Sequence, residues 1–243
     1  MIIMAKIVEV SPIKLKNPVL IEGFPGVGMI GTIAAMHLVK EWNMELVGYI
    51  DSDEFPPICT IHNEEPLPAA RIYQSKKYNT LVLFSEFVIP MNAVNDVANE
   101  IILWGEDRKL SAIISLGGVG LSAIKEEVFG IASTDGLKKE LKDIKVTVVK
   151  EGVTTGVTGL VLANAYIRKF PAAAILTSNK NMSINLVGAA KVLDKLSELL
   201  NIPINTNKLQ KEGEELEEKI KQMLKETKDV KKTYEQIQSP MYR

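Results

Sequence analysis

Four glycines in one short stretch have the spacing that most suggests chemistry, and they lie between an apolar run and a helical pattern: Gly23, Gly26, Gly28 and Gly31. The last three match G-x-G-x-x-G, the spacing with which dinucleotide-binding proteins turn tightly and bring the backbone close to a pyrophosphate. Asp51 follows at about the distance where such proteins bind a ribose hydroxyl. Pro25, however, interrupts the approach to this fingerprint and removes an amide that would face a phosphate. Two interpretations stay open, a phosphate-binding loop or glycines that only let the helix pack closely on the sheet.

Two more glycine-rich turns, at residues 117–120 and 152–156, also follow apolar runs. The three turns are expected at the carboxyl ends of strands, where doubly wound folds bind ligands. Catalysis would need nucleophiles or titratable groups in these turns. The polar groups in or beside them share no spacing with a nucleophile elbow, a Walker loop or a metal motif: Glu22, Asp51, Glu86, Lys150, Glu151, Thr154 and Thr155. We therefore expect no catalytic residue, with a nucleotide-binding or phosphorylase-like enzyme as the alternative.

Histidine and cysteine are scarce, with only His37, His62 and Cys59 in the chain. This count excludes an intrachain disulfide framework and leaves no recognisable zinc site. Each histidine is expected to be a packed or solvated side chain. Cys59 lies in an apolar strand pattern and is expected to be a small core residue. The sequence thus predicts neither a metal nor a cofactor.

Composition and charge limit the classes of function. With 243 residues, of which 46% are hydrophobic, the chain can bury one large core. A net charge of −1 gives no field that attracts nucleic acid or an anionic membrane, so neither is expected as a partner. No segment approaches the roughly 20 apolar residues that span a bilayer, and residues 1–10 do not resemble a signal peptide. We expect a cytoplasmic protein.

The elements that must position the glycine turns alternate between strand and helix patterns. Strands are predicted at 19–22, 46–50, 80–85, 112–116, 146–149 and 172–177, and helices at 29–40, 94–104, 157–170 and 186–200. The first three elements have the pattern of a parallel βαβ unit. Around a turn-rich segment, 58–62 and 71–74 predict a hairpin or an excursion at the sheet edge. This alternation predicts an α/β fold, a three-layer α/β/α arrangement with a mostly parallel open sheet.

The composition changes after Pro203, where Lys and Glu dominate. Within residues 204–238 a heptad seam runs at alternating spacings of four and three, through Leu209, Leu216, Ile220, Met223 and Val230 among others. The seam predicts a C-terminal helical extension that packs either on its own domain or against other copies of the chain. We therefore divide the chain into an α/β domain at 1–203, a helix at 204–238 and a flexible tail at 239–243.

The last three residues, Met241, Tyr242 and Arg243, are a hydrophobic residue, a tyrosine and one further residue. This order resembles the HbYX signature by which activators and some assembly chaperones dock on the proteasome core particle. In the body, residues 22–31 and 152–160 are similar to the two glycine-rich signatures of the proteasome assembly chaperone family of archaea and eukaryotes. The glycines of these stretches that we expect to be structural are Gly23, Gly26, Gly28, Gly31, Gly152, Gly156 and Gly159.

The resemblance implies an archaeal homologue of this family, with a three-layer body and no known catalytic residues. It also implies a homo-oligomer, a tetramer or a pentamer, that contacts the α-subunit ring of the proteasome as an assembly chaperone or ATP-independent activator. Met241, Tyr242 and Arg243 would enter a pocket between α subunits, with the terminal carboxylate against a lysine and the tyrosine ring buried. Several tails on one oligomer would bind together more tightly than one tail.

Overall fold

The structure, a computed structural model, describes residues 5–120, 128–179, 183–207, 209, 218, 221, 222 and 225. Nine strands form one sheet: β1 (Ala5–Glu9), β2 (Val19–Gly23), β3 (Glu45–Ser52), β6 (Ala70–Ser75), β7 (Thr80–Ser85), β8 (Ala112–Val119), β9 (Val128–Ala132), β10 (Thr147–Val148) and β11 (Ala172–Ser178). The helices are α1 (Ile30–Glu41), α2 (Val94–Asp107), α3 (Asp135–Asp143), α4 (Gly156–Arg168) and α5 (Leu186–Leu200), and a short 3₁₀ turn, η1 (Val27–Met29), precedes α1.

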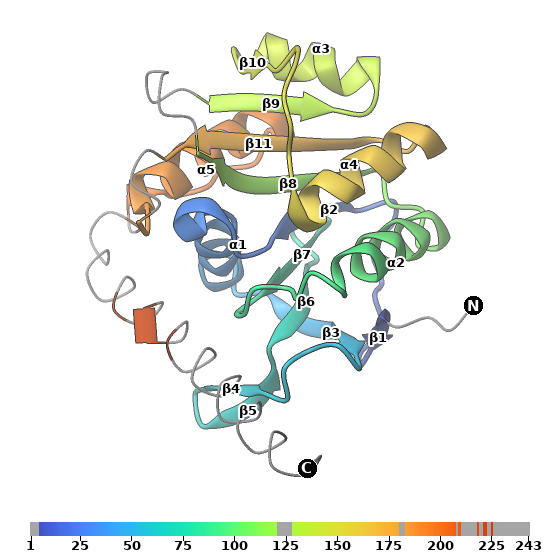
Figure 1. Ribbon diagram of the computed structural model, residues 1–243, viewed down its shortest axis with the longest axis vertical. Coiled ribbons are helices and arrows are strands. Elements are labelled where there is room, and N and C mark those ends of the chain that lie inside the picture. The colour runs from blue at the N-terminus through green and yellow to red at the C-terminus, as the bar shows by residue number, and fades with distance from the viewer. Residues whose placement is uncertain are drawn as a thin grey trace, which may run out of the picture.

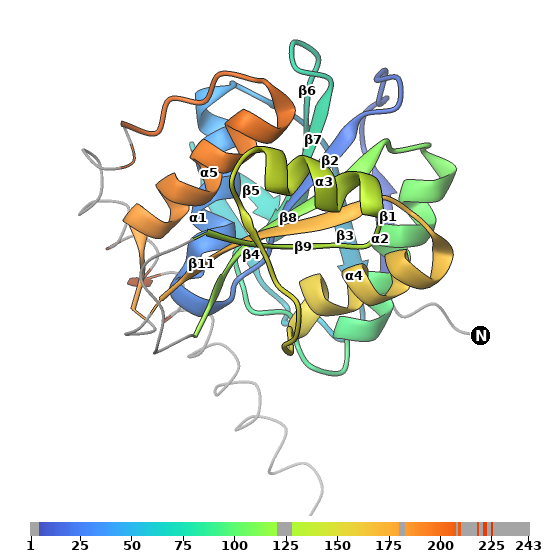
Figure 2. The same ribbon diagram turned by 90° about the horizontal axis from the view of Figure 1, so that it is seen from above.

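Three layers make up the body, as the sequence predicted (Figure 1, Figure 2). Helices α1, α3 and α5 cover one face of the sheet, and α2 and α4 cover the other. Successive residues of a strand point to opposite faces. In β2, accordingly, Leu20 packs under α2 and α4 while Ile21 packs under α1 and α5. The carboxyl end of β2 therefore lies between two complete hydrophobic cores.

The sheet has the order β1-β3-β6-β7-β2-β8-β11-β9-β10. Its centre, β7-β2-β8-β11, is parallel, which confirms the predicted α/β class. The flanks contain antiparallel pairs: β1 pairs with β3, β3 with β6, β6 with β7, and β9 with β11. The last pair, β9 with β10, is parallel. β3 runs in the same direction as β2, but β6 and β7 lie between them, so the first βαβ unit does not join neighbouring strands.

A separate hairpin of β4 (Cys59–His62) and β5 (Glu65–Pro68) lies apart from the large sheet (Figure 1). A hairpin or an excursion at the sheet edge was predicted around 58–62 and 71–74, and a hairpin is present. Its second strand is β5, however, and 71–74 lies in β6 of the large sheet. The turn explains the difference, because Asn63 and Glu64 both have positive φ, 51° and 68°, which closes a two-residue hairpin. Cys59 is exposed on β4, so its expected place in the core is wrong.

The start of the C-terminal extension packs on the domain. Leu209 is 2% exposed in the core formed with α1 and α5. All the described residues of the extension from residue 207 onward have helical backbone. The other seam residues, Leu216, Ile220, Met223 and Val230, and the tail residues Met241, Tyr242 and Arg243 lie outside the described residues, and the division at residue 203 stays a prediction. Within the described part of the chain, none of the helices has the length and apolarity to cross a membrane.

Candidate functional site

The glycine loop between β2 and α1 is pressed against the strand beside it. A Cβ added at Gly31 would lie 2.3 Å from the carbonyl oxygen of Leu116 in β8. One added at Gly23 would lie 2.2 Å from the carbonyl oxygen of Gly31. Real Cβ atoms do not approach a carbonyl this closely, so only glycine allows the helix and the two strands to come together here. The packing interpretation of these two glycines has direct geometric support.

The tip of the loop packs against the end of β8 and against the segment that follows β11. The amide of Asn185 donates to the carbonyl oxygen of Gly28 over 3.0 Å. Gly28 has φ +69°, and a Cβ there would lie 2.4 Å from the side-chain nitrogen of Asn179. A Cβ on Gly118 would meet the carbonyl oxygen of Val27 at 2.3 Å. The glycine loop, the end of β8 and the segment after β11 thus pack closely against one another at this end of the sheet.

Gly28→Ala should lower the free energy of unfolding for two reasons. Alanine is strained at the positive φ of this position, and its methyl group would overlap the side chain of Asn179. We expect a loss of about 1–3 kcal/mol in denaturant unfolding. Gly26→Ala is the matched control, since a Cβ at Gly26 has no atom within 4 Å and the φ of Gly26 is −158°. A dinucleotide that raised the melting temperature of the wild type but not of Gly28→Ala would contradict this packing role.

The second glycine turn leads into α4. Gly156 has φ +73°, which favours glycine, and a Cβ on Gly159 would lie 2.7 Å from the carbonyl oxygen of Thr154. Gly152 has more room, with its nearest neighbour at 3.6 Å. Two of the three glycines in this turn therefore have a local backbone reason to be glycine.

A buried carboxyl group joins the two glycine-rich stretches. Glu22, at the end of β2, is fully buried, and the Thr158 hydroxyl in the first turn of α4 donates to its Oε1 over 2.9 Å. Ser115 lies opposite Glu22 in the β2–β8 register, and Oε2 has no hydrogen-bond partner within the described residues. Burial raises the pKa of Glu22 to about 7 from 4.5, although contacts with Thr158 and Ser115 oppose the shift. Near neutral pH this side chain exists partly as a neutral acid.

The raised pKa of Glu22 predicts that ionisation of this group opposes folding. The unfolded chain loses this proton near pH 4.5 and the folded chain near pH 7, so stability falls as the pH rises between these values. The interval corresponds to a loss of about 3 kcal/mol. Glutamine does not ionise, so Glu22→Gln should not lose this stability. The free energy of unfolding of Glu22→Gln minus that of the wild type should therefore be about 3 kcal/mol larger at pH 8 than at pH 4.5. Urea titrations at several pH values measure the difference, and one that does not change with pH would contradict the prediction.

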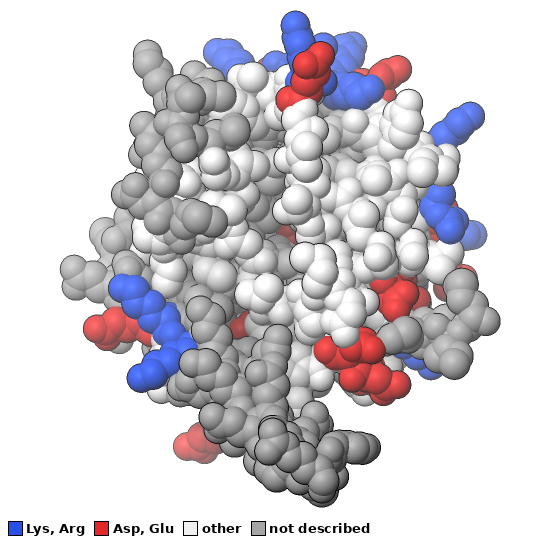
Figure 3. All heavy atoms as spheres, in the orientation of Figure 1, with Lys and Arg blue, Asp and Glu red and all other residues white. Residues whose placement is uncertain are grey.

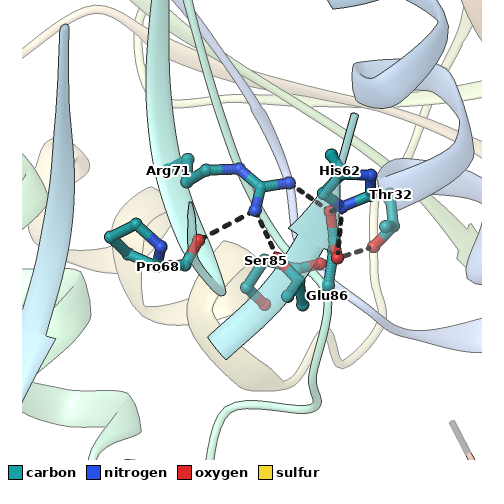
Figure 4. Close-up of polar contacts among 7 residues, drawn as sticks. Thr32, His62, Pro68, Arg71, Ser85 and Glu86 are labelled. Atoms are coloured by element: carbon teal, nitrogen blue, oxygen red, sulfur yellow. Dashed lines mark hydrogen bonds and ion pairs between the residues drawn. The ribbon is translucent and has the colours of Figure 1, made fainter. Parts of the chain in front are cut away.

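A second polar cluster fixes the β4–β5 hairpin to the large sheet (Figure 4). The carboxylate of Glu86 accepts hydrogen bonds from His62 Nε2, at 2.8 and 3.0 Å, and pairs with the guanidinium of Arg71. Arg71 also donates to Thr60 Oγ1 at 2.6 Å and to the carbonyl oxygen of Pro68 at 2.9 Å. Burial alone would raise the pKa of Glu86, but His62 and Arg71 outweigh it and hold this pKa below its usual range.

This cluster contains half of a catalytic arrangement, a carboxylate that orients an imidazole. A nucleophile would have to lie beside His62. The thiol of Cys59 does not, because residues 59 and 62 of a strand point to opposite faces. The Thr60 hydroxyl is occupied by Arg71. The contacts that are present attach the hairpin to β6 and to the end of β7. The role of this cluster is therefore structural.

Other polar residues singled out from the sequence lie away from these two clusters. His37 is buried in α1, and its Nε2 lies 2.9 Å from the carbonyl oxygen of Asn205. Asp51 lies in β3, which is separated from β2 by two strands, so it does not reach the glycine loop. Within the described ranges, no three His, Cys, Asp or Glu side chains are grouped as metal ligands.

The outer surface above the glycine turns is largely uncharged. Figure 3 shows white, uncharged side chains over the middle of this face, where Figure 1 places α4 and the loop before it, and charged groups toward its rim. A shallow hollow of about 460 Å³ lies between β9, this loop and α4. Val153 and Tyr166, which both line this hollow, are 91% and 67% exposed. Apolar patches of this kind are typical of protein–protein contacts.

Sequence comparison gives the relationship. The PAC2 family matches residues 20–224, most of the chain. The chain belongs to the PAC2 family. The match includes both glycine-rich stretches and the first part of the C-terminal extension. The glycine contacts described above are therefore part of a PAC2 domain.

Relatives of this PAC2 protein align with it over nearly their whole length. MJ0106 of Methanocaldococcus jannaschii is 32% identical over 218 residues, 90% of this chain and 90% of that protein. Pyrococcus furiosus PbaA, an archaeal homolog of proteasome-assembly chaperone, has a TM-score of 0.83 at 32% identity, covering 93% of this chain and 99% of PbaA. P. furiosus PbaB, an archaeal proteasome activator, has a TM-score of 0.74 at 21% identity, covering 91% and 99%. The similarity to PbaB shows a shared fold.

Sequence reasoning did not find the two polar clusters of this PAC2 domain. Glu22 and Thr158 are 136 positions apart, and His62 and Glu86 are 24 apart. One signal for the first cluster was present, because Glu22 ends an otherwise apolar strand. A carboxyl group buried there needs a hydrogen-bond donor or a proton. The sequence did not identify the donor.

Proposed function

We propose that this PAC2 protein is an assembly chaperone or ATP-independent activator of the proteasome that binds the α-subunit ring of the core particle without catalysing a reaction. The observation that carries the proposal is the similarity to PbaA, at 32% identity and a TM-score of 0.83 over 93% of the chain. This role would place the protein in the cytoplasm with the proteasome.

The docking element in this proposal is the C-terminus, with Met241, Tyr242 and Arg243. A chain end can place its carboxylate against a cationic side chain and bury a tyrosine ring and an apolar side chain in one pocket. The signature of the tail is the support for this assignment. The uncharged face with Val153 and Tyr166 is a second surface through which the body can contact a protein partner.

We further propose that the protein acts as a homo-oligomer, a tetramer or a pentamer. Leu209, the first seam residue, is already buried against its own domain. We propose that the other seam residues, Leu216, Ile220, Met223 and Val230, which lie outside the described residues, pack against helices of other copies. An oligomer presents several tails at once, and this raises the affinity for a ring of α subunits.

Binding is favoured over catalysis because the polar residues of the two clusters make contacts that join elements of the fold. Glu22 is paired with an α4 hydroxyl, and His62, Arg71 and Glu86 fix a hairpin. The alternative, a nucleotide-binding or phosphorylase-like enzyme, would use the glycine turns. Two parallel assays separate the two classes. A pull-down with proteasome α subunits should retain them, while nucleosides, dinucleotides and phosphate should leave the melting temperature unchanged. The opposite pair of results would favour the enzyme.

A further inference from the structure

The β4–β5 hairpin has two outer edges, and they differ in chemistry. The two strands form a sheet of their own, so each has a strand neighbour on one side only within the described residues. The register pairs Cys59 with Pro68, Thr60 with Leu67, Ile61 with Pro66 and His62 with Glu65. A two-residue turn makes the last pair a hydrogen-bonded one, and such pairs alternate along the ladder. The main-chain groups of residues 59 and 61, and of 66 and 68, therefore point outward.

The β5 edge is closed. Both of its outward positions, Pro66 and Pro68, are prolines and have no N–H to offer. The carbonyl oxygen of Pro68 is bound by Arg71. Proline on an edge strand is one of the ways in which proteins prevent strands of other chains from adding to a sheet. This edge cannot extend the sheet.

The β4 edge has none of these protections. Its residues, Cys59 to His62, include no proline and no Lys, Arg, Asp or Glu. Within the described residues, no hydrogen bond is found for the main-chain groups of Cys59 or Ile61. The side chains of these two residues are exposed, that of Ile61 at 63%. An open, uncharged edge with apolar side chains is a template for another strand.

The edge is also held in a fixed position. Thr60 bonds to Arg71, which is 2% exposed, and His62 bonds to Glu86, which is 1% exposed. Figure 4 shows His62 directed toward Glu86. These contacts orient the inner face of β4 and leave the opposite face, with Cys59 and Ile61, outside. A strand fixed before binding loses little conformational entropy when a second strand pairs with it.

We propose that β4 pairs antiparallel with β4 of a second copy of the chain about a two-fold axis through Thr60. In this register Cys59 lies opposite the partner's Ile61, and Ile61 lies opposite the partner's Cys59. Both pairs are of the hydrogen-bonded kind, so four main-chain hydrogen bonds join the copies in a sheet of order β5-β4-β4-β5. On the outer face each isoleucine packs beside a cysteine of the other copy.

Charge favours a second copy as the occupant of this edge. Like charges placed opposite each other across a strand pair are destabilising, and no charged side chain of β4 would meet its own counterpart in this register. This contact is one interface of the homo-oligomer proposed above, and the inference rests on that proposal. A two-fold contact is present in a dimer or a tetramer with two-fold axes but not in a single five-membered ring. The edge therefore favours a tetramer.

The register can be tested by oxidation with oxygen and copper–phenanthroline. Ile61→Cys places a thiol opposite the native Cys59 of the other copy at a Cα separation of about 5.5 Å, within disulfide range. Non-reducing gels should then show a covalent dimer for most of the chains. In the wild type, and in Cys59→Ser combined with Ile61→Cys, the remaining thiols are about 8 Å apart, beyond disulfide range. These two controls should stay monomeric on the gel.

Ile61→Pro gives an independent measurement, because it removes only an outward N–H and copies the chemistry of Pro66. It should leave the melting temperature within a few degrees of the wild type and reduce the mass by light scattering. Equal cross-linking in Ile61→Cys, the wild type and the double variant would overturn the proposal. So would the absence of a cross-link in Ile61→Cys when light scattering shows that its oligomer is intact. Either result would leave the proposed function in place. Loss of α-subunit binding in Ile61→Pro at unchanged mass would assign the edge to a different partner and overturn self-pairing.

Discussion

Deletion of Met241, Tyr242 and Arg243 should abolish capture of proteasome α subunits and stimulation of peptide hydrolysis by the core particle. The deletion removes the buried ring, the apolar side chain and the native position of the carboxylate together, which are the groups that bind in carboxylate capture. Several tails act on one ring, so the loss per tail is multiplied in the assembly. Stimulation by increasing concentrations of wild-type and truncated protein measures the effect.

Single changes in the tail separate the contributing groups. Tyr242→Ala should cost about 2–4 kcal/mol per tail, the range of a buried aromatic anchor. One residue added after Arg243 displaces the carboxylate and should act like the deletion. Arg243→Ala is the matched control and should change binding little. The signature allows any residue at the last position, so the group that binds there is the main-chain carboxylate. Full binding and stimulation by the deletion variant would show that the docking surface lies on the α/β body.

Arg71→Met should be the most destabilising single change in the folded body. Glu86 would remain 1% exposed with its guanidinium partner gone, and Thr60 and Pro68 would lose a donor. Removing one partner of a buried ion pair costs about 3–5 kcal/mol. Denaturant unfolding monitored by circular dichroism measures this loss. We expect the hairpin to detach from β6 and β7 in the variant, with exposed amides in hydrogen exchange.

Two further variants test the cause of this loss. Arg71→Met combined with Glu86→Gln should recover part of the stability, because no charge is then left buried without a partner. Arg168→Met removes an ion pair with Glu106 whose side chains are 41% and 38% exposed, and it should cost under about 1 kcal/mol. Equal losses in Arg71→Met and Arg168→Met would contradict the role of burial.

Strongly apolar elements of the fold were predictable from the sequence. The strand at 80–85 and the helix at 186–200 were predicted with the boundaries of β7 and α5. Both have a dense pattern, since every residue of β7 is buried and α5 has an apolar stripe. β9 and α3 were not predicted. α3 buries only Leu137 and Leu141 among charged residues, which is too few to set a helical period.

The order of the strands could not be read from local patterns. A strand segment does not specify by itself which other strand it pairs with, so the antiparallel flanks were not predicted. The second strand of the hairpin was misplaced for a different, local reason. Asn63 and Glu64 form its turn without the Asn-Gly or Asp-Gly pair that usually signals one.

The candidate site was predictable only in part. The glycine stretches were found from their spacing, and the structure supports a packing reason for Gly23, Gly28 and Gly31. The donor to Glu22 and the carboxylate partner of His62 come from other elements, and no spacing in one sequence specifies such a pair. The tail residues were singled out from their order alone, and their role stays a prediction.

The proposed function requires that the protein bind proteasome α subunits as an oligomer. Native mass spectrometry of the full chain, alone and mixed with purified α subunits, measures this binding. We predict an assembly of more than one copy, and in the mixture a new species whose mass is the sum of that assembly and α subunits. A mixture in which the chain stays a monomer and every component keeps its own mass would contradict the claim.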